Sequence, residues 1–196
     1  MKLDEEFYQG PDVTQIARNL LGKGLFTRVK GIQTGGIIVE TEAYSWKERG
    51  CHAYNAKKTD RNAIMFEAGG HAYVYLCYGI HNLFNVVTNT HGVADAVLVR
   101  ALEPLTGVAE MEARRGKLAN PYHLTSGPGK LTRALGIDRS YNGKFLRDNE
   151  VWIEDVGKKV AKRDIEASAR IGIDYAGEDA LLPWRFTIRD NRWISR

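Results

Sequence analysis

The pattern of apolar and polar residues at the start of the chain predicts a helix followed by a β-hairpin. Apolar residues recur at helical spacing over 13–21, and Gly22 ends the pattern. Residues 24–30 and 37–44 are rich in β-forming residues and bracket the glycine-containing stretch 31–36, which we expect to be a turn. Two strands so close in sequence pair antiparallel.

Similar patterns continue to the end of the chain and predict an α+β fold. We see no repeat, low-complexity tract or linker, so we expect one domain over residues 1–196. Short turns join most neighbouring strands, which favours a mostly antiparallel, curved β-sheet with peripheral helices. The further strands are expected at 72–78, 83–88, 94–102, 151–156 and 184–189, and the further helices at 105–116, 128–136 and near 177–182.

The bulk composition is that of an ordinary globular protein with a modest basic charge. Of the 196 residues, 43% are hydrophobic and 27% charged, and the net charge is +4. A basic balance suits a polyanionic partner, although many proteins that never bind nucleic acid have such a charge. Two cysteines, Cys51 and Cys77, form no C-x-x-C pair and are expected to be reduced thiols. With neither a signal peptide nor an apolar run long enough for a membrane span, we expect a cytoplasmic protein that binds no membrane, associated with the nucleoid if bacterial.

Two glutamates lie on one face of the strand predicted at 37–44. Alternation places Glu40, Glu42 and Tyr44 together, opposite a face of apolar or small residues. Such a face is most often directed at solvent. A carboxylate beside an aromatic ring near a strand end is also a suitable general base in a cleft, and periodicity does not decide between the two interpretations.

Tyrosines dominate the strand predicted at 72–78. Tyr73 and Tyr75 share a face, and Tyr78 stands at the strand end before Gly79. Tyrosine favours strands, which by itself explains the pattern. The functional interpretation is a set of rings that stack on a base or insert into a duplex.

Two segments could contact phosphate. The stretch 55–62 carries Lys57, Lys58 and Arg61, although such a charge run is usually a solvated loop. Residues 126–130 (SGPGK) form a turn that enters a helix, a natural phosphate seat, but the motif is weak because it is not a Walker sequence.

Several enzyme classes lack their signatures here. None of the five histidines stands at metal-ligand spacing, and the H-x-E and C-x-x-C pattern of zinc deaminases is absent. The sequence also has no G-x-S-x-G elbow and no G-x-G-x-x-G after a strand.

Taken together, these motifs resemble the alkyladenine (3-methyladenine) DNA glycosylase family over nearly the whole chain. Six ordered segments at suitable spacing make the resemblance very specific. They are IVETEAY at 38–44, TDRNAIMF at 59–66, YVYLCYG at 73–79, LVRALEP at 98–104, SGPGKL at 126–131 and the RIGI…AGE region at 170–178.

The resemblance implies the catalytic residues and the cofactor requirement. Glu42 matches the family's general base for the attacking water, and Arg100 matches the arginine that holds this water. The family uses no metal, no iron–sulfur cluster and no lysine Schiff base, so we expect no cofactor and no strand cleavage.

The resemblance also implies the DNA-binding residues. Tyr44 and His52 correspond to one wall of the base pocket and Tyr75 to the other, while Asn85 screens the exocyclic groups of the purine. Tyr78 matches the residue that fills the gap left by the everted nucleotide. The loop 45–51 and Leu83 differ from the family's usual pattern, and both border the expected pocket. Two basic residues, Arg61 and Lys130, are the expected phosphate contacts.

The implied function is that of a monofunctional, monomeric DNA glycosylase of base excision repair. It would evert alkylated or deaminated purines, such as 3-methyladenine, 7-methylguanine, hypoxanthine and ethenoadenine, from duplex DNA. One alternative is a damaged-DNA-binding protein that has lost turnover. A third hypothesis, a nucleoside or glycoside hydrolase for small molecules, predicts activity without DNA.

Overall fold

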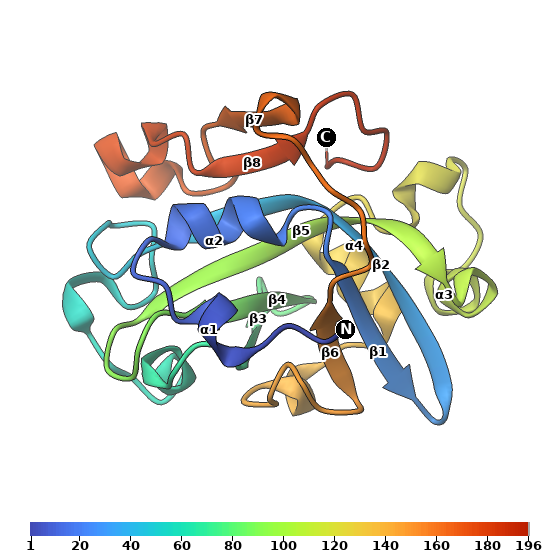
Figure 1. Cartoon of the computed structure of the whole chain (residues 1–196), viewed down its shortest axis with the longest axis horizontal. Helices are drawn as coiled ribbons and strands as arrows, with labels where there is room; N and C mark the ends of the chain where they lie inside the picture. Colours follow the sequence, from blue (N-terminus) through green and yellow to red (C-terminus); the bar gives the residue numbers. More distant parts are fainter. Residues whose placement is uncertain (196) are drawn as a thin grey trace.

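An antiparallel β-sheet organises the computed structural model of the chain, which describes residues 1–195 (Figure 1). The strands follow the order β3-β4-β5-β2-β1-β6, and β8 pairs with both β2 and β7. Every pairing is antiparallel, so the predicted α+β class is confirmed. The strands are β1 Gly24–Val29, β2 Ile32–Tyr44, β3 Ala72–Cys77, β4 His81–Thr88, β5 Asp95–Thr106, β6 Val151–Glu154, β7 Ile165–Ser168 and β8 Arg185–Ile188.

Short helices surround the sheet. The α-helices are α1 Glu5–Tyr8, α2 Val13–Leu20, α3 Val108–Arg115 and α4 Pro128–Leu135. In Figure 1, α2 runs along the face of the sheet formed by β2 and β5, close to β8. The 3-10 segments are Tyr54–Ala56, Ala63–Phe66, Pro121–Leu124, Arg139–Tyr141, Lys162–Asp164 and Asp174–Leu181. No helix in residues 1–195 is long and apolar enough to cross a membrane.

The predicted turn at 31–36 is wrong, because β2 already begins at Ile32. The two glycines in this stretch serve packing inside the strand. A Cβ atom at Gly35 would collide with the Phe26 ring, and one at Gly36 would press on the backbone of β5. The hairpin instead turns at Lys30 and Gly31, both of which have positive φ. Only Gly31 therefore serves the chain reversal, whereas Gly35 and Gly36 allow close packing of neighbouring strands.

The central strand β2 is covered on both faces. Its first half pairs with β1, residues 40–42 pair with β8, and its other edge pairs with β5. On one face the Thr41 hydroxyl donates a 2.9 Å hydrogen bond to the Ala17 carbonyl of α2. Because the segments on either side of β8, at Ile171 and Ser195, contact the carboxylates on the other face, Glu40 and Glu42 are fully buried and do not face solvent.

Several predicted element boundaries move. The helix predicted at 105–116 begins only at Val108, because β5 continues to Thr106 and Gly107 (φ 70°) makes the turn. The strand predicted at 151–156 ends at Glu154, and the helix near 177–182 is a 3-10 segment interrupted at Gly177. Neither α1 nor β7 was predicted; β7 is mostly exposed and lacks the buried residues of the equally short strands β6 and β8.

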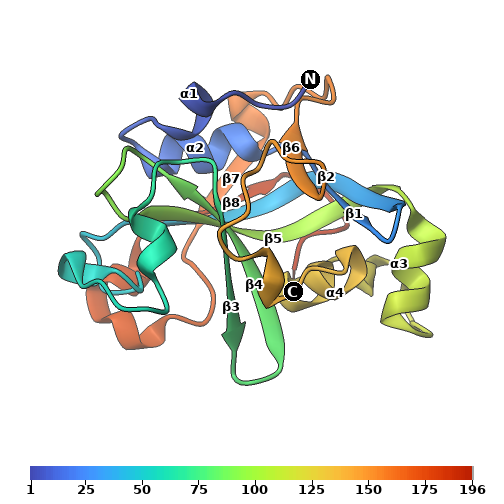
Figure 2. The same ribbon diagram turned by 90° about the horizontal axis from the view of Figure 1, so that it is seen from below.

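The hairpin of β3 and β4 projects away from the body of the molecule (Figure 2). Its loop contains Tyr78 (φ 50°) and Gly79 (φ 73°), the left-handed conformations that a tight hairpin turn requires. The loop side chains Tyr78 and Ile80 are 87% and 72% exposed. Tyr78, which was expected at the end of a strand, therefore projects outward at the tip of the hairpin.

The irregular segment after β2 is anchored by a small core of its own. Cys51, Ala53, Met65 and Phe66 pack against Tyr73 and neighbouring strand residues. Cys51 and Cys77 are both free thiols. This core fixes the backbone that carries His52 close to the tyrosines of β3.

Candidate active site

A row of directly paired residues crosses the sheet and carries the centre of the site. Glu42 pairs with Leu98, Leu98 with Asn85, and Asn85 with Tyr73. Paired residues of antiparallel neighbours point to the same face. Four strands thus direct their side chains to one side of the sheet, opposite α2.

Three groups from different segments hold the Glu42 carboxylate. The Tyr44 hydroxyl donates to Oε2 at 2.8 Å and Arg100 Nη1 donates to the same oxygen at 3.2 Å. The backbone N–H of Ile171 donates to Oε1 at 2.8 Å. A carboxylate buried without such partners would be costly, so these three hydrogen bonds are what allow Glu42 to lie in the interior.

Burial and the neighbouring Glu42 carboxylate raise the pKa of Tyr44 well above its ordinary value. Tyr44 therefore stays protonated and remains a donor to Glu42. Behind its ring lies the Arg170 guanidinium, 4.7 Å from the ring centroid. Arg170 is locked in turn by two 2.7 Å hydrogen bonds to the buried Glu48 carboxylate.

Glu40 was predicted only to share the face of Glu42, and its partners were not foreseen. Its Oε1 accepts hydrogen bonds from Arg100 Nε at 3.0 Å, Arg185 Nε at 2.7 Å and Ser195 Oγ at 2.7 Å. Arg100 consequently bridges two buried glutamates. The sequence motifs gave no signal for these partners, because the last motif ends at residue 178, before Arg185 and Ser195.

An aromatic cluster forms the opposite part of the site. The ring centroids of Tyr73 and Tyr75 are 5.3 Å apart, and the His52 ring meets Tyr75 edge-on at 4.6 Å. His52 Nδ1 and the Tyr73 hydroxyl are 2.8 Å apart. Arg61 lies over the Tyr75 ring at 5.0 Å. Part of His52 is exposed, yet burial of its ring and then the Arg61 charge lower the pKa of His52 to about 4. The imidazole is therefore neutral at physiological pH.

Asn85 is buried in the floor between these groups. Its side-chain nitrogen donates to the Tyr73 carbonyl at 3.1 Å. This bond orients the amide relative to β3.

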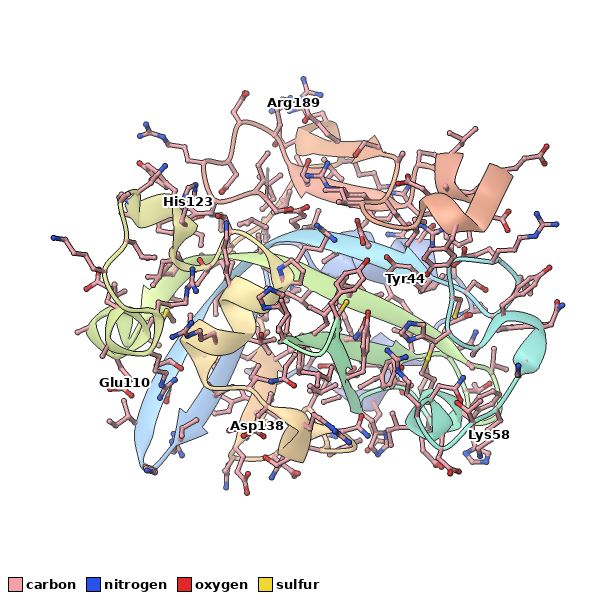
Figure 3. The ribbon with its side chains drawn as sticks, turned by 180° about the vertical axis from the view of Figure 1, so that it is seen from behind. Tyr44, Lys58, Glu110, His123, Asp138 and Arg189 are labelled. Atoms are coloured by element: carbon pink, nitrogen blue, oxygen red, sulfur yellow. The ribbon has the colours of Figure 1, made fainter. Side chains whose placement is uncertain are left out.

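One cleft of about 840 Å³ joins these residues. Eight of the nine predicted site residues line it, and Glu42 lies directly behind the lining formed by Tyr44, Arg100 and Ile171. Figure 3 shows Tyr44 towards the interior of the molecule and Lys58 at its periphery. The eight lining residues are Tyr44, His52, Arg61, Tyr75, Tyr78, Asn85, Arg100 and Lys130.

The SGPGK segment forms the far side of the cleft and leads into α4. Pro128 occupies the first turn of this helix, where its missing N–H costs nothing. Gly129 leaves no room for a side chain because the His81 ring lies against it. Lys130 is half-buried at this helix N-terminus, where the backbone N–H groups favour an anion.

The sequence also matches known proteins over its length. The family model for methylpurine-DNA glycosylase matches residues 6–192. The chain belongs to the methylpurine-DNA glycosylase family. It is accordingly a DNA-repair enzyme that hydrolyses N-glycosyl bonds, and its substrate is DNA.

Proteins from several bacteria align with nearly all of this chain. A Chlamydia abortus protein is 46% identical over 188 residues, which cover 95% of this chain and 97% of its own length. Proteins of Bacillus cereus strain B4264 and Alkaliphilus oremlandii are 43% and 44% identical, each with both chains covered completely. All three carry the provisional name 3-methyladenine DNA glycosylase.

Within residues 1–195, no three His, Cys, Asp or Glu side chains are grouped so that they could hold a metal ion. The Glu40 and Glu42 carboxylates behind the cleft are paired with Arg100, and Glu48 is paired with Arg170.

Proposed function

We propose that this glycosylase everts an alkylated or deaminated purine from duplex DNA into the cleft and hydrolyses its N-glycosidic bond with a water activated by Glu42. The observation that carries the proposal is the buried Glu42 carboxylate, held by Arg100 and Tyr44 at the inner end of a cleft lined by aromatic rings. Glycosylase relatives that carry 3-methyladenine in their names support a methylated purine as substrate.

Eversion comes first, because a stacked nucleotide hides its sugar from any side chain. Unstacking and unpairing cost a few kcal/mol, and less for a damaged base. Tyr44, His52 and Tyr75 return about 1–3 kcal/mol for each ring that stacks on the base. The exposed Tyr78 at the hairpin tip fills the gap in the duplex.

Selection and anchoring use the polar residues of the same cleft. The fixed Asn85 amide screens the exocyclic groups of the everted purine. Arg61 and Lys130, on two sides of the cleft, contact the DNA phosphates.

Hydrolysis then needs one base and one electrostatic stabiliser. The bond from the sugar C1′ to the purine nitrogen breaks, and the purine leaves with the bonding electron pair. The water oxygen bonds to C1′ and gives its proton to Glu42. The carboxylate also stabilises the positive charge that develops on the sugar, as in inverting glycosidases. Water needs access to Glu42 in the DNA complex, where hydrogen bonds of the free enzyme rearrange.

The decisive experiment replaces Glu42 by Gln. We expect single-turnover release of 3-methyladenine from methylated duplex DNA to be lost, while binding of a lesion duplex persists. Glu166→Gln, at an exposed glutamate, is the matched control and keeps normal activity. Release at the wild-type rate by Glu42→Gln would exclude Glu42 as the base. A wild-type chain that binds lesions without turnover would instead favour the inactive damaged-DNA-binding protein.

Tyr78→Ala separates a duplex enzyme from a small-molecule hydrolase. Because Tyr78 is 87% exposed, its loss leaves the fold stable. We expect excision from duplex DNA to collapse, with no hydrolysis of free nucleosides by either protein. The DNA strand that has lost its base stays uncut until it is treated with alkali, as expected for a monofunctional glycosylase. We also propose that the enzyme acts as a monomer in the cytoplasm. Its molar mass in solution, measured by static light scattering, tests the monomer.

A further inference from the structure

We propose that Glu40, Arg185 and Ser195 are positioning residues that orient Arg100 and reserve its charge for Glu42, and thereby set the acid limit of excision. This inference rests on the proposed role of Glu42 as general base. It concerns residues that lie behind the cleft and do not reach the substrate, apart from Ser195 at its lining.

The geometry distributes the donors of Arg100 without overlap. Its Nε donates to Glu40 at 3.0 Å, its Nη1 to Glu42 at 3.2 Å, and its Nη2 to Ser195 Oγ at 3.4 Å. One edge of the guanidinium is thus fixed by Glu40 and Ser195. The remaining nitrogen is directed at the catalytic carboxylate, so the planar group has one orientation.

Glu40 is fully buried and saturated by its neighbours. It accepts from Arg100 and Arg185, from the Ser195 hydroxyl, and from the Ser195 backbone N–H at 2.5 Å. Arg185 also donates to the Ser195 carbonyl at 3.2 Å. The segment around Ser195 is thereby tied to the same carboxylate that holds Arg100.

Charge balance gives this arrangement its function. Two buried carboxylates, Glu40 and Glu42, face two guanidiniums, Arg100 and Arg185. Tyr44 is a neutral neighbour on the strand of Glu42, and the guanidinium of Arg170, on the segment that covers them, is already paired with Glu48. Arg185 neutralises Glu40, which leaves the Arg100 charge to Glu42.

Removing the charge of Arg185 and removing that of Glu40 change the electrostatic environment of Glu42 in opposite directions. In Arg185→Met, two carboxylates share one guanidinium, so a proton binds to the pair more easily. In Glu40→Gln, both guanidiniums face a single carboxylate, so a proton binds less easily. Opposite or like charges at this distance move a protonation midpoint by about 1–3 pH units.

The test is the pH dependence of single-turnover release of 3-methyladenine from methylated DNA. This purine is cationic in the DNA and leaves without being protonated, so the acid limb reports the enzyme. The acid limb is the pH range in which the excision rate falls as the solution becomes more acidic. We expect it to move to higher pH by about one unit or more in Arg185→Met and to lower pH in Glu40→Gln. The double variant Glu40→Gln/Arg185→Met restores the balance and returns the limb towards its wild-type position.

Two further variants separate this role from simple support of the fold. Ser195→Ala removes a hydrogen bond and no charge. The excision rate should therefore fall about 3- to 10-fold, while the pH position of the acid limb stays unchanged. Arg189→Ala, at the exposed outer edge of the molecule beyond β8, changes neither (Figure 3). Thermal unfolding of each variant accompanies the assays.

The possible failures are distinguishable. If Glu42→Gln keeps wild-type release, the proposed function is wrong. If Glu42→Gln is inactive but the acid limbs of Glu40→Gln and Arg185→Met coincide with the wild type, only the positioning role falls. If Arg185→Met does not fold, Glu40→Gln and the double variant still decide, because both predict a defined limb position.

Discussion

The Tyr44 hydroxyl donates a 2.8 Å hydrogen bond to Oε2 of Glu42, two residues earlier on the same strand. Tyr44 was predicted as a wall of the base pocket, and the structure adds a second contact, to the candidate base itself. One residue thus links the surface that receives the purine to the carboxylate that would activate water.

Removing this hydroxyl tests the link. Because a hydrogen bond to a charged group contributes about 1.5–3 kcal/mol, Tyr44→Phe should slow single-turnover excision by about 10- to 100-fold. Stacking on the base is preserved, so affinity for a lesion duplex changes little. Tyr54→Phe, at a tyrosine outside the cleft lining, is the control. An unchanged rate in Tyr44→Phe would show that the bond has no part in the chemistry.

The Arg170–Glu48 pair should be a major contributor to stability. The Arg170 side chain is completely buried and donates to both oxygens of Glu48 at 2.7 Å. Arg170→Met leaves a buried charge unpaired, and we expect it to lower the free energy of unfolding by about 3–5 kcal/mol in urea titrations.

A double variant and an exposed ion pair serve as controls for the stability measurement on Arg170→Met. Arg170→Met/Glu48→Gln should recover part of the loss, because no unpaired charge remains. At the exposed pair of Arg189 and Glu166, Arg189→Ala should cost less than about 1 kcal/mol. A loss this small in Arg170→Met would contradict the predicted contribution.

His52 should make the fold less stable in acid. Its pKa is lowered from 6.5 to about 4 by burial of the ring and by Arg61. The unfolded chain therefore takes up a proton at a higher pH than the folded one, so stability is lost as pH falls from about 6.5 towards 4.

The variant His52→Gln isolates this contribution. We expect its melting temperature to fall less steeply than that of the wild type across this pH window. His91→Gln, at an exposed histidine, should follow the wild-type curve. Parallel curves for His52→Gln and the wild type would refute the prediction.

Salt dependence should identify the phosphate contacts. If Lys130 neutralises one phosphate, Lys130→Ala reduces the slope of log K against log salt by about 0.9. Lys162 lines a separate hollow beside α2, so Lys162→Ala should leave the slope unchanged. Fluorescence anisotropy with a lesion duplex at several salt concentrations measures both, and equal slopes for Lys130→Ala and the wild type would remove Lys130 from the interface.

Local patterns predicted much of the fold, and where they failed the reason is tertiary. The helix after Asp12 and the hairpin ending in Tyr78 were foreseen, because amphipathic spacing and turn chemistry are local. Gly35 was misread as part of a turn, because its actual requirement is space for the Phe26 ring of the neighbouring strand. Such a requirement has no signature in local sequence.

The sequence by itself determined that Glu42 and Tyr44 share one face of a strand, that Tyr78 stands at the end of a strand, and which family motifs the chain contains. Only the tertiary structure decided that this face is buried, since the segments at Ile171 and Ser195 close over it. It alone brought Ser195 to Glu40, 155 residues away. Periodicity reports which side of a strand a residue occupies, whereas burial and charge pairing depend on which distant segments cover that side.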